Sequence, residues 1–444
     1  MGSDYPARLK ARPRGYADTM GDERNWAGNL LYRASSIEHP ESIDELRGLL
    51  TAGGSVRVLG SRHCFNDIAD TTGSLIALDR MPQVIDISPA RDSVRVSGGL
   101  RYGDIAPVLE EQGLALANLA SLPHISVAGA VATGTHGSGD ATGSLASAVR
   151  AVTVMTASGE VRSLARGDDG FDGAVVALGA LGAVIDLTLD VEPSYQVAQH
   201  VFEHPSWDAI LRDLGAVTGV GTSVSIFSTW QRTDVADQIW IKQRVPATRA
   251  DAAERRAARE ALAVSLGAAP AEGKRHPIIG VDPEACTEQE GVAGPWFQRL
   301  PHFKLEFTPS AGAEIQSEYL VPRLDAVAAI EAVRSLADRI APLLLVNEIR
   351  TVCADDLWLS SSYGTDAVGL HFTWKPDEAA VRELLPTIEA ALPASARPHW
   401  GKVFTLDGAE VRSRYPRWDD FAALVAKHDP ERRLVNEYLE RLGL

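Results

Sequence analysis

Short apolar segments that end at glycine-containing turns fill the first part of the chain. Their spacing predicts strands over residues 56–59, 75–78, 84–87, 93–97, 151–156 and 183–190. The apolar positions over 102–113 predict a helix that ends at a glycine cap, and a small-residue helix is expected over 171–178. Because strands and helices do not alternate regularly, the pattern indicates an α+β fold and not a Rossmann sheet.

From about residue 196 the apolar segments become longer and alternate with amphipathic helices. Strands are expected over 223–230, 238–244, 343–352, 368–374 and 403–406. Helices are expected over 323–340, 377–392 and 418–428, and a long loop over 268–294. The stretch 248–266 is rich in Ala, Arg and Glu, which is typical of a surface helix that depends on intrinsic propensity.

The length requires more than one core. At 444 residues, with 45% hydrophobic and 23% charged residues, the chain has the composition of a folded protein with two or three domains. We expect a flexible arm over 1–24, a first domain over 25–195 and a second domain from residue 196.

The net charge of −16 disfavours nucleic acid and anionic membranes as partners, because both are negatively charged. No apolar run approaches the roughly 20 residues of a membrane span, and the basic N-terminus lacks the apolar core of a secretory signal. Cys64, Cys286 and Cys353 are odd in number and widely spaced, which fits neither a disulfide framework nor a zinc site. These features predict a cytoplasmic protein without a bound metal.

The segment 58–67, Val-Leu-Gly-Ser-Arg-His-Cys-Phe-Asn-Asp, is the most informative turn. A strand that stops at Gly60 and continues into small polar residues can present backbone N–H groups to phosphate oxygens. His63 would then lie within reach of a cofactor ring. Taken alone, the ten residues fit an ordinary strand–turn with a solvated histidine better, so the interpretation depends on later segments.

Residues 128–139 carry almost only tiny side chains, Ala-Gly-Ala-Val-Ala-Thr-Gly-Thr-His-Gly-Ser-Gly. Glycine costs backbone entropy and buries little area, so a packed core gains little from such a run. Close approach of a flat group or a pyrophosphate explains it better than a tightly crossed helix does. Gly137, Gly139 and Gly143 imitate a dinucleotide fingerprint, but their spacing is one residue too long, which disfavours a nicotinamide-binding domain.

Polar side chains interrupt three apolar segments of the second domain. Period-two alternation places Glu348 with Arg350 on one face of a strand, and His371 with Thr373 on one face of another. Lys402 interrupts what we interpret as a third apolar strand. Buried charge is costly unless it is paired or used. A structural salt bridge is one explanation, and a polar cavity that binds hydroxyl groups is the other; the repetition favours the cavity.

Together these segments resemble the vanillyl-alcohol-oxidase-type family of covalent FAD-linked oxidases, and within it the bacterial alditol (xylitol) oxidases. The resemblance runs from about residue 25 to the C-terminus. Its most specific pieces are residues 120–139, Glu348-Ile349-Arg350-Thr351, His371-Phe372-Thr373-Trp374 and Pro398-His399-Trp400-Gly401-Lys402. It implies a PCMH-type oxidase fold with an FAD-binding domain over 25–195, a substrate (cap) domain over 196–395, and a segment over 396–444 that returns to the FAD-binding domain.

The resemblance also implies how the cofactor is held. His63 would carry FAD covalently through a ring nitrogen, and His399 would approach the flavin from the second domain. Backbone near Ala183 would meet the adenine end. The remaining cofactor-binding residues lie on the turn and in the small-residue run: Leu59, Gly60, Ser61, Arg62, Cys64, Ser121, Ser126, Gly129, Ala130, Val131, Ala132 and Thr133.

The implied reaction is oxidation of the terminal primary alcohol of a small polyol to the aldose, with O2 reduced to hydrogen peroxide. Arg350 and Lys402 would stabilise the developing alkoxide, Lys402 or a water it orients would accept the proton, and Glu348 would orient the neighbouring hydroxyls. The substrate-binding set is Ser121, Glu348, Arg350, His371, Thr373 and Lys402. We expect a monomer.

Alternatives remain open on the sequence alone. Cys64 stands where the family leads us to expect serine, and we predict a buried neutral thiol and a single covalent link. An aldonolactone oxidase of the same family, a dehydrogenase that passes electrons to a dye or quinone, and a non-redox sugar-binding or hydrolytic protein are the competing hypotheses.

Overall fold

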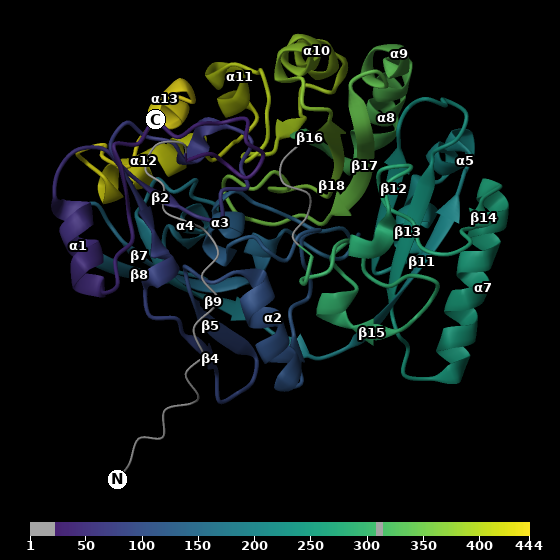
Figure 1. The fold of residues 1–444 in the computed structure, drawn as a ribbon, viewed down its shortest axis with the longest axis horizontal. Coiled ribbons are helices and arrows are strands. Elements are labelled where there is room, and N and C mark those ends of the chain that lie inside the picture. The colour runs from purple at the N-terminus through teal and green to yellow at the C-terminus, as the bar shows by residue number, and fades with distance from the viewer. Residues whose placement is uncertain (1–22, 308–313) are drawn as a thin grey trace.

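The computed structural model describes residues 23–307 and 314–444, so most of the expected arm over 1–24 lies outside the described residues. Within these ranges the first part of the chain forms two main sheets (Figure 1). A parallel sheet has the order β1-β3-β2, and an antiparallel sheet has the order β4-β5-β9-β7-β8. Their strands are β1 Ser36–Glu38, β2 Val56–Leu59, β3 Ser74–Ala77, β4 Ile85–Ile87, β5 Ser93–Ser97, β7 Val149–Met155, β8 Val161–Ala165 and β9 Ala183–Asp190.

The described residues of the first part form four α-helices. Helix α1 (Ile43–Thr51) is capped by Ser42, whose hydroxyl accepts from the Glu45 N–H at 3.2 Å, and it buries Leu46 and Leu50. Three further helices, α2 (Tyr102–Glu111), α3 (Val127–Ala132) and α4 (Phe171–Val175), pack against the antiparallel sheet, together with the short pair β6 (Leu114–Ala115) and β10 (Glu192–Pro193).

The second part is built on one large sheet with the strand order β14-β11-β13-β12-β17-β18-β16-β19 among the described residues, and β15 also pairs with β11. The strands are β11 Gln196–Glu203, β12 Ser223–Ser228, β13 Gln238–Arg244, β14 Ala269–Pro270, β15 Gly294–Pro295, β16 Ile315–Pro322, β17 Leu344–Val352, β18 Ala367–Trp374 and β19 Arg397–Pro398. The helices are α5 Trp207–Arg212, α6 Leu214–Gly219, α7 Arg249–Leu266, α8 Ala326–Ser335, α9 Ala337–Ile340 and α10 Glu378–Ala391.

The central strands of this sheet bury both faces, and the two faces differ in chemistry. Ile349, Leu370 and Tyr319 are paired neighbours on adjacent strands and pack with the apolar sides of α8 and α10. Successive side chains of a strand point to opposite faces. The intervening residues, which are mainly polar, therefore share the face turned away from these helices.

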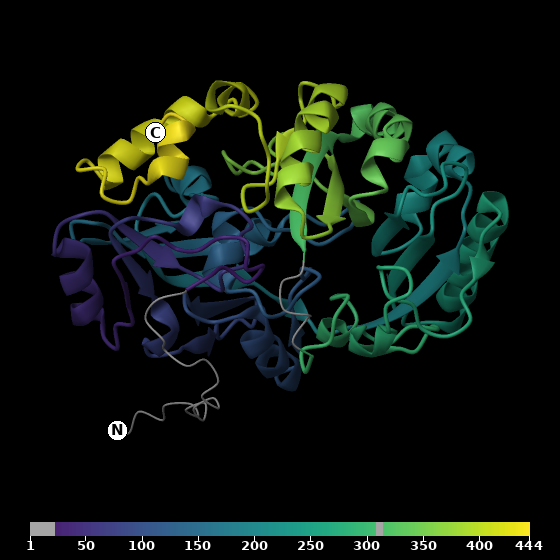
Figure 2. The same cartoon turned by 45° about the horizontal axis from the view of Figure 1, so that its top comes forward.

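The C-terminal segment packs against the first part of the chain. Helices α12 (Trp418–His428) and α13 (Glu437–Arg441) lie over the N-terminal strands in both ribbon views, and α11 (Gly408–Ser413) lies between them and α10 (Figure 2). The amide of Asn436 donates to the carbonyls of Asp67, Ile68 and Asp70 at 3.2, 3.1 and 2.7 Å. Buried Arg57 donates to the carbonyls of Leu434 and Ile68, which ties the C-terminal segment to β2.

Most predicted elements form within two or three residues of their expected ends, and three expectations are wrong. The helix expected over 323–340 is divided, because α8 ends at Ser335 and α9 begins at Ala337. No strand forms over 403–406, and Lys402 lies on a turn after β19, where its N–H donates to the His399 carbonyl at 3.0 Å. The loop expected over 268–294 contains the short strand β14, a 3₁₀ turn over Pro283–Ala285 and the start of β15.

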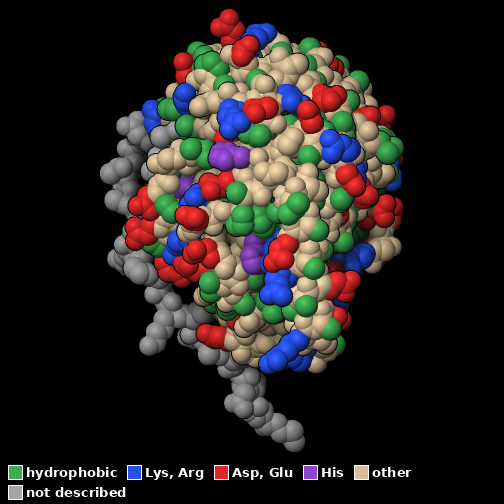
Figure 3. Space-filling model, turned by 90° about the vertical axis from the view of Figure 1, so that its right-hand side faces the viewer, with side chains coloured by type: hydrophobic (Ala, Val, Ile, Leu, Met, Phe, Trp, Pro, Cys, Tyr) green, Lys and Arg blue, Asp and Glu red, His purple; other side chains and the backbone are tan. Residues whose placement is uncertain are grey.

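The predicted surface helix is confirmed as α7, whose buried residues are only Arg259, Ala263 and Leu266. The side of the molecule that carries α7 displays basic and acidic side chains interspersed with one another (Figure 3). Across the described ranges, every helix is too short or too polar to serve as a bilayer span.

Candidate active site

A buried charge cluster lies where β17, β18 and β16 meet. Strand register places Glu348 opposite His371 and His371 opposite Glu318, so these side chains share one face. The Arg350 guanidinium contacts Glu318 through Nη2 at 2.8 Å and faces Glu348 Oε2 through Nε at 3.7 Å. All four side chains are buried. Burial acts to raise the pKa of Glu318 and of Glu348, but Arg350 and the neighbouring histidines together outweigh it and hold both pKa values below their ordinary range.

Two polar atoms in this cluster have no hydrogen-bond partner among the described residues. They are Arg350 Nε and His371 Nδ1, which lie 3.7 and 4.0 Å from the same oxygen, Glu348 Oε2. These separations are too long for hydrogen bonds. Buried polar groups are almost always satisfied, so the three atoms outline a place for a small polar ligand. A hydroxyl group suits it, because a hydroxyl can accept from Arg350 and donate to Glu348.

Lys402 lies between His371 of this cluster and Phe65 of the first part of the chain. Its ammonium donates to Gln316 Oε1, lies 3.3 Å from His371 Nε2, and lies 5.1 Å from the ring centroid of Phe65. Its carbonyl accepts from the Asn66 amide at 2.7 Å, which holds the turn on the first domain. Burial lowers the pKa of Lys402 to about 8, so the amine can lose its proton near neutral pH.

His63 follows strand β2 on the expected turn; the residue is partly buried, and both of its ring nitrogens are covered. Its ring stacks on Trp26 with centroids 5.3 Å apart and planes 19° apart. Neither ring nitrogen has a hydrogen-bond partner among the described residues. Burial lowers the pKa of His63 to about 4, so the imidazole is neutral at pH 7. A neutral buried imidazole with two unused nitrogens fits a residue that bonds to a cofactor through one of them.

The neighbouring Cys64 is a partly buried free thiol. Burial raises its pKa to about 11, which keeps it protonated and unreactive. A Cβ added at Gly401 would lie 3.2 Å from Cys64 Sγ, so the thiol faces the backbone of the Lys402 turn.

The small-residue run lies against the His63 turn. Ser61 and Ser126 bond each other reciprocally: the Ser61 N–H donates to Ser126 Oγ at 3.2 Å, and the Ser126 N–H donates to Ser61 Oγ at 3.0 Å. A Cβ at Gly60 or at Gly129 would lie 2.6 Å from Ser126 Oγ, so a larger residue at either position would displace the hydroxyl that bonds Ser61. Arg62 has a φ of 64°, a left-handed conformation that sharpens the turn. This narrow backbone cradle fits the phosphate and sugar-alcohol part of FAD.

Five further predicted cofactor residues lie on or next to this cradle, whereas Ser121 and His399 lie at the charge cluster. Leu59 ends β2, Ala130, Val131 and Ala132 lie on α3, and Thr133 follows it and donates to the Gly129 carbonyl at 3.0 Å. Ala183 begins β9 and packs in a different hydrophobic cluster, with Met155.

Ser121 and Thr373 lie at the borders of the charge cluster. The Ser121 carbonyl accepts from the N–H groups of His302 and Phe303 at 3.1 and 3.3 Å. Thr373 is opposite Gln316 in the register and so shares the face of His371. The structure thus brings Glu348, Arg350, His371, Thr373 and Lys402 together, as the sequence predicted.

Five residues that the sequence analysis missed belong to the same face or border it. They are His136, Lys242, His302, Gln316 and Glu318. Glu318 and Gln316 lie on β16, which the hydrophobic pattern did not predict, although Gln316 and Glu318 alternate with buried Ser317 and Tyr319. His136 stood within the small-residue run and was not singled out.

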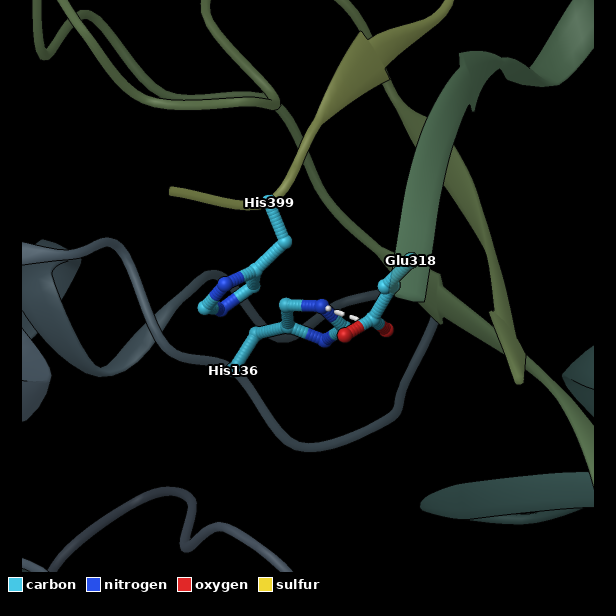
Figure 4. Close-up of side chains that lie close together, drawn as sticks. All are labelled: His136, Glu318 and His399. Atoms are coloured by element: carbon cyan, nitrogen blue, oxygen red, sulfur yellow. Dashed lines mark ion pairs between the residues drawn. The ribbon is translucent and has the colours of Figure 1, made fainter. Parts of the chain in front are cut away.

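His136, Glu318 and His399 converge from three separate segments of the chain (Figure 4). Their nearest ligand-type atoms lie within 4.8 Å of one another, a spacing that could suit a metal ion. Glu318 Oε1, however, already faces Arg350 at 2.8 Å and His136 Nε2 at 3.1 Å. His399 Nδ1 accepts from the Gly401 N–H at 3.1 Å. A guanidinium on the same carboxylate oxygen repels a second cation, so the geometry suits an ion-pair cluster better than a metal site.

Two family models and several known proteins are similar to this chain. A family model described as "FAD binding domain" matches residues 35–165, and one described as "D-arabinono-1,4-lactone oxidase" matches residues 313–442. Alditol oxidase of Streptomyces sp. (strain IKD472 / FERM P-14339) is 45% identical, over 94% of this chain and 98% of that protein. L-gulono-1,4-lactone dehydrogenase of Mycobacterium tuberculosis (strain ATCC 25618 / H37Rv) is 28% identical, over 94% of this chain and 98% of that protein.

Among solved structures, a solvent-stable cholesterol oxidase has a TM-score of 0.73 at 17% identity, over 95% of this chain and 97% of that chain. This likeness concerns the fold, and it confirms the predicted α+β, PCMH-type architecture. The FAD-binding match confirms FAD as the cofactor class. The chain belongs to the vanillyl-alcohol-oxidase-type family of FAD-linked oxidases, in the branch that includes alditol oxidase.

Proposed function

We propose that this protein oxidises the terminal primary alcohol of an alditol, such as xylitol or sorbitol, to the aldose and reduces O2 to hydrogen peroxide. The observation that carries this proposal is the pair of unpartnered atoms, Arg350 Nε and His371 Nδ1, that face Glu348 Oε2. A polyol presents a hydroxyl on every carbon and can satisfy several such atoms at once. The 45% identity to an alditol oxidase supports the same substrate class.

We further propose that FAD is attached covalently and only through His63. The proposal is supported by a neutral imidazole whose two ring nitrogens lack a hydrogen-bond partner within 23–307 and 314–444, and by the adjoining backbone cradle of Gly60, Ser126 and Gly129. The protonated thiol of Cys64 does not favour a second link. When bound, FAD supplies the acceptor for the hydride that leaves the alcohol carbon.

Side chains of the protein accept the alcohol proton and orient the substrate. Lys402, with a pKa lowered by burial to about 8, accepts the hydroxyl proton directly or through a water. Arg350 stabilises the oxygen as negative charge develops on it. Glu348, kept ionised by Arg350 and the neighbouring histidines, accepts hydrogen bonds from neighbouring hydroxyls. These bonds select which carbon of the substrate would face the flavin.

The alternative within the family is an aldonolactone oxidase. The D-arabinono-1,4-lactone oxidase model that matches residues 313–442 supports this alternative. A 1,4-lactone has a carbonyl at C1 and holds the C4 oxygen in its ring, so it offers fewer hydroxyl groups than an alditol of the same length. A site that binds several hydroxyls rejects analogues that leave its own buried groups unpaired.

Purified protein is expected to produce hydrogen peroxide with xylitol or sorbitol at a kcat/KM at least about tenfold higher than with L-gulono-1,4-lactone. A peroxide-coupled assay under air measures both substrates. A preference for the lactone would support the aldonolactone alternative, oxidation of a dye without oxygen uptake would indicate a dehydrogenase, and colourless protein would contradict a flavoenzyme.

His63→Ala is expected to abolish covalent flavin, because no other imidazole is available on the turn. Acid precipitation followed by absorbance of the pellet near the flavin bands measures attachment. Cys64→Ser is the matched control on the adjacent residue and is expected to keep its flavin. Flavin retained by denatured His63→Ala protein, or lost from Cys64→Ser, would place the attachment elsewhere.

Lys402→Met is expected to lower kcat on xylitol by about 100-fold or more, a usual size for loss of a general base. Because the neutral amine is the active form, wild-type kcat/KM should rise with pH through about 8, and the variant should lose this rise. Lys375→Met, at an exposed lysine that donates to the Pro342 carbonyl at 2.7 Å, is the control and should behave as wild type. An intact Lys402→Met enzyme would remove the lysine from the reaction.

A further inference from the structure

A chain of three buried polar side chains leads from the interior of the large sheet to the substrate-facing carboxylate. Lys242 Nζ lies 3.0 Å from His302 Nδ1, and His302 Nε2 lies 2.8 Å from Glu348 Oε1. Their exposed fractions are 1%, 5% and 5%. We propose that Lys242 and His302 are positioning residues that hold Glu348 in the orientation that binds a substrate hydroxyl. This inference rests on the proposed function of Glu348 and extends it to two residues on other segments of the chain.

The directions of the two hydrogen bonds are determined by the chemistry of the end groups. Glu348 is ionised and can only accept, so His302 Nε2 must carry the hydrogen. Burial lowers the pKa of His302 to about 4, which keeps the ring neutral and leaves a lone pair on Nδ1. Lys242 therefore donates to Nδ1. The lysine selects the tautomer of His302, and this tautomer is the one that donates to Glu348.

The same lysine also fixes the backbone around the histidine. Lys242 Nζ donates to the Leu300 carbonyl at 2.5 Å, two residues before His302. The N–H of His302 donates to the Ser121 carbonyl of the first domain. His302 is thereby held at its side chain and at its backbone, and it connects Ser121 with Glu348.

Aromatic rings restrict the remaining freedom of His302. Phe227 and Trp240 lie edge-on to it, with ring centroids 5.7 and 5.2 Å away. This packing leaves the imidazole plane directed at Glu348. Burying a lysine in such apolar surroundings is costly unless its donors are hydrogen-bonded, and Lys242 bonds both the Leu300 carbonyl and His302.

The bond from His302 determines which oxygen of Glu348 is available to the substrate. His302 occupies Oε1, and Oε2 lies 3.7 Å from Arg350 Nε, so a hydroxyl placed beside this pair can bond both atoms. Without the bond from His302, the carboxylate can turn and bond Arg350 directly. That rotation would close the gap and compete with the substrate for both groups.

Paired substitutions at His302 test the proposal. A glutamine amide reaches the place of Nε2 and can donate to Glu348, whereas an asparagine amide reaches only the place of Nδ1. His302→Gln is expected to keep KM for xylitol within about threefold of wild type. His302→Asn is expected to raise KM about tenfold or more, the size of one lost hydrogen bond to a charged group, while kcat changes less than about threefold.

Lys242→Met provides the second measurement. It should raise KM about as much as His302→Asn, and the double variant should be no worse than His302→Asn alone, because both act through one bond. Covalent flavin content, measured on denatured protein, should equal that of wild type in every variant, which separates loss of positioning from loss of the cofactor.

Wild-type enzyme in the same assay separates a failure of the proposed function from a failure of the positioning role. Absence of wild-type turnover on alditols would overturn the proposed function. An active wild type with equal KM values for His302→Gln and His302→Asn would overturn the positioning role alone. If His302→Asn does not accumulate as folded protein, Lys242→Met decides: an unchanged KM overturns the proposal and a raised KM supports it.

Discussion

A guanidinium held between two buried carboxylates, Arg350 between Glu318 and Glu348, is the interaction on which the site depends. Two carboxylates this close in a dry interior could not both stay ionised without the cation, and the cation would not remain there without them. The contact to Glu318 at 2.8 Å anchors the guanidinium, while the wider separation from Glu348, 3.7 Å, leaves an unfilled position on its other edge. The close ion pair thus fixes the guanidinium, and the wider one leaves Arg350 Nε and Glu348 Oε2 without a hydrogen bond to each other.

The two halves of the molecule meet around this position. The first part supplies His63, the glycine-lined cradle and the Ser121 carbonyl, and the large sheet supplies the charge cluster. The turn of Lys402 joins them, since it bonds Asn66 on one side and Gln316 on the other. A redox ring carried on His63 and an alcohol bound at Arg350 would consequently be brought together by the fold itself, as a vanillyl-alcohol-oxidase-type enzyme requires.

Sequence reasoning succeeded where a local pattern carries the information. Alternation along single strands paired Glu348 with Arg350 and His371 with Thr373. The small-residue run predicted a segment that another group approaches closely. It failed where the information is in strand pairing. Glu318 joins the cluster only because β16 lies beside β18, and the weak hydrophobic signal of Gln316-Ser317-Glu318 concealed that strand. Lys242 and His302 are distant in sequence from Glu348, and no spacing rule connects them. Lys402 was predicted correctly as a site residue but on a strand that does not exist, because its neighbours Trp400 and Val403 are apolar for packing against two different cores.

The most direct test of the central interaction is the kinetics of Arg350→Lys on xylitol, measured beside its covalent flavin content. Lysine keeps the positive charge between the carboxylates but lacks the Nε–H that faces the open position, and it cannot reproduce the fork of donors. We predict that kcat/KM falls by about 100-fold or more while the flavin stays attached. A variant within about threefold of wild type would show that charge alone is sufficient and that the unfilled donor of Arg350 does not bind the substrate.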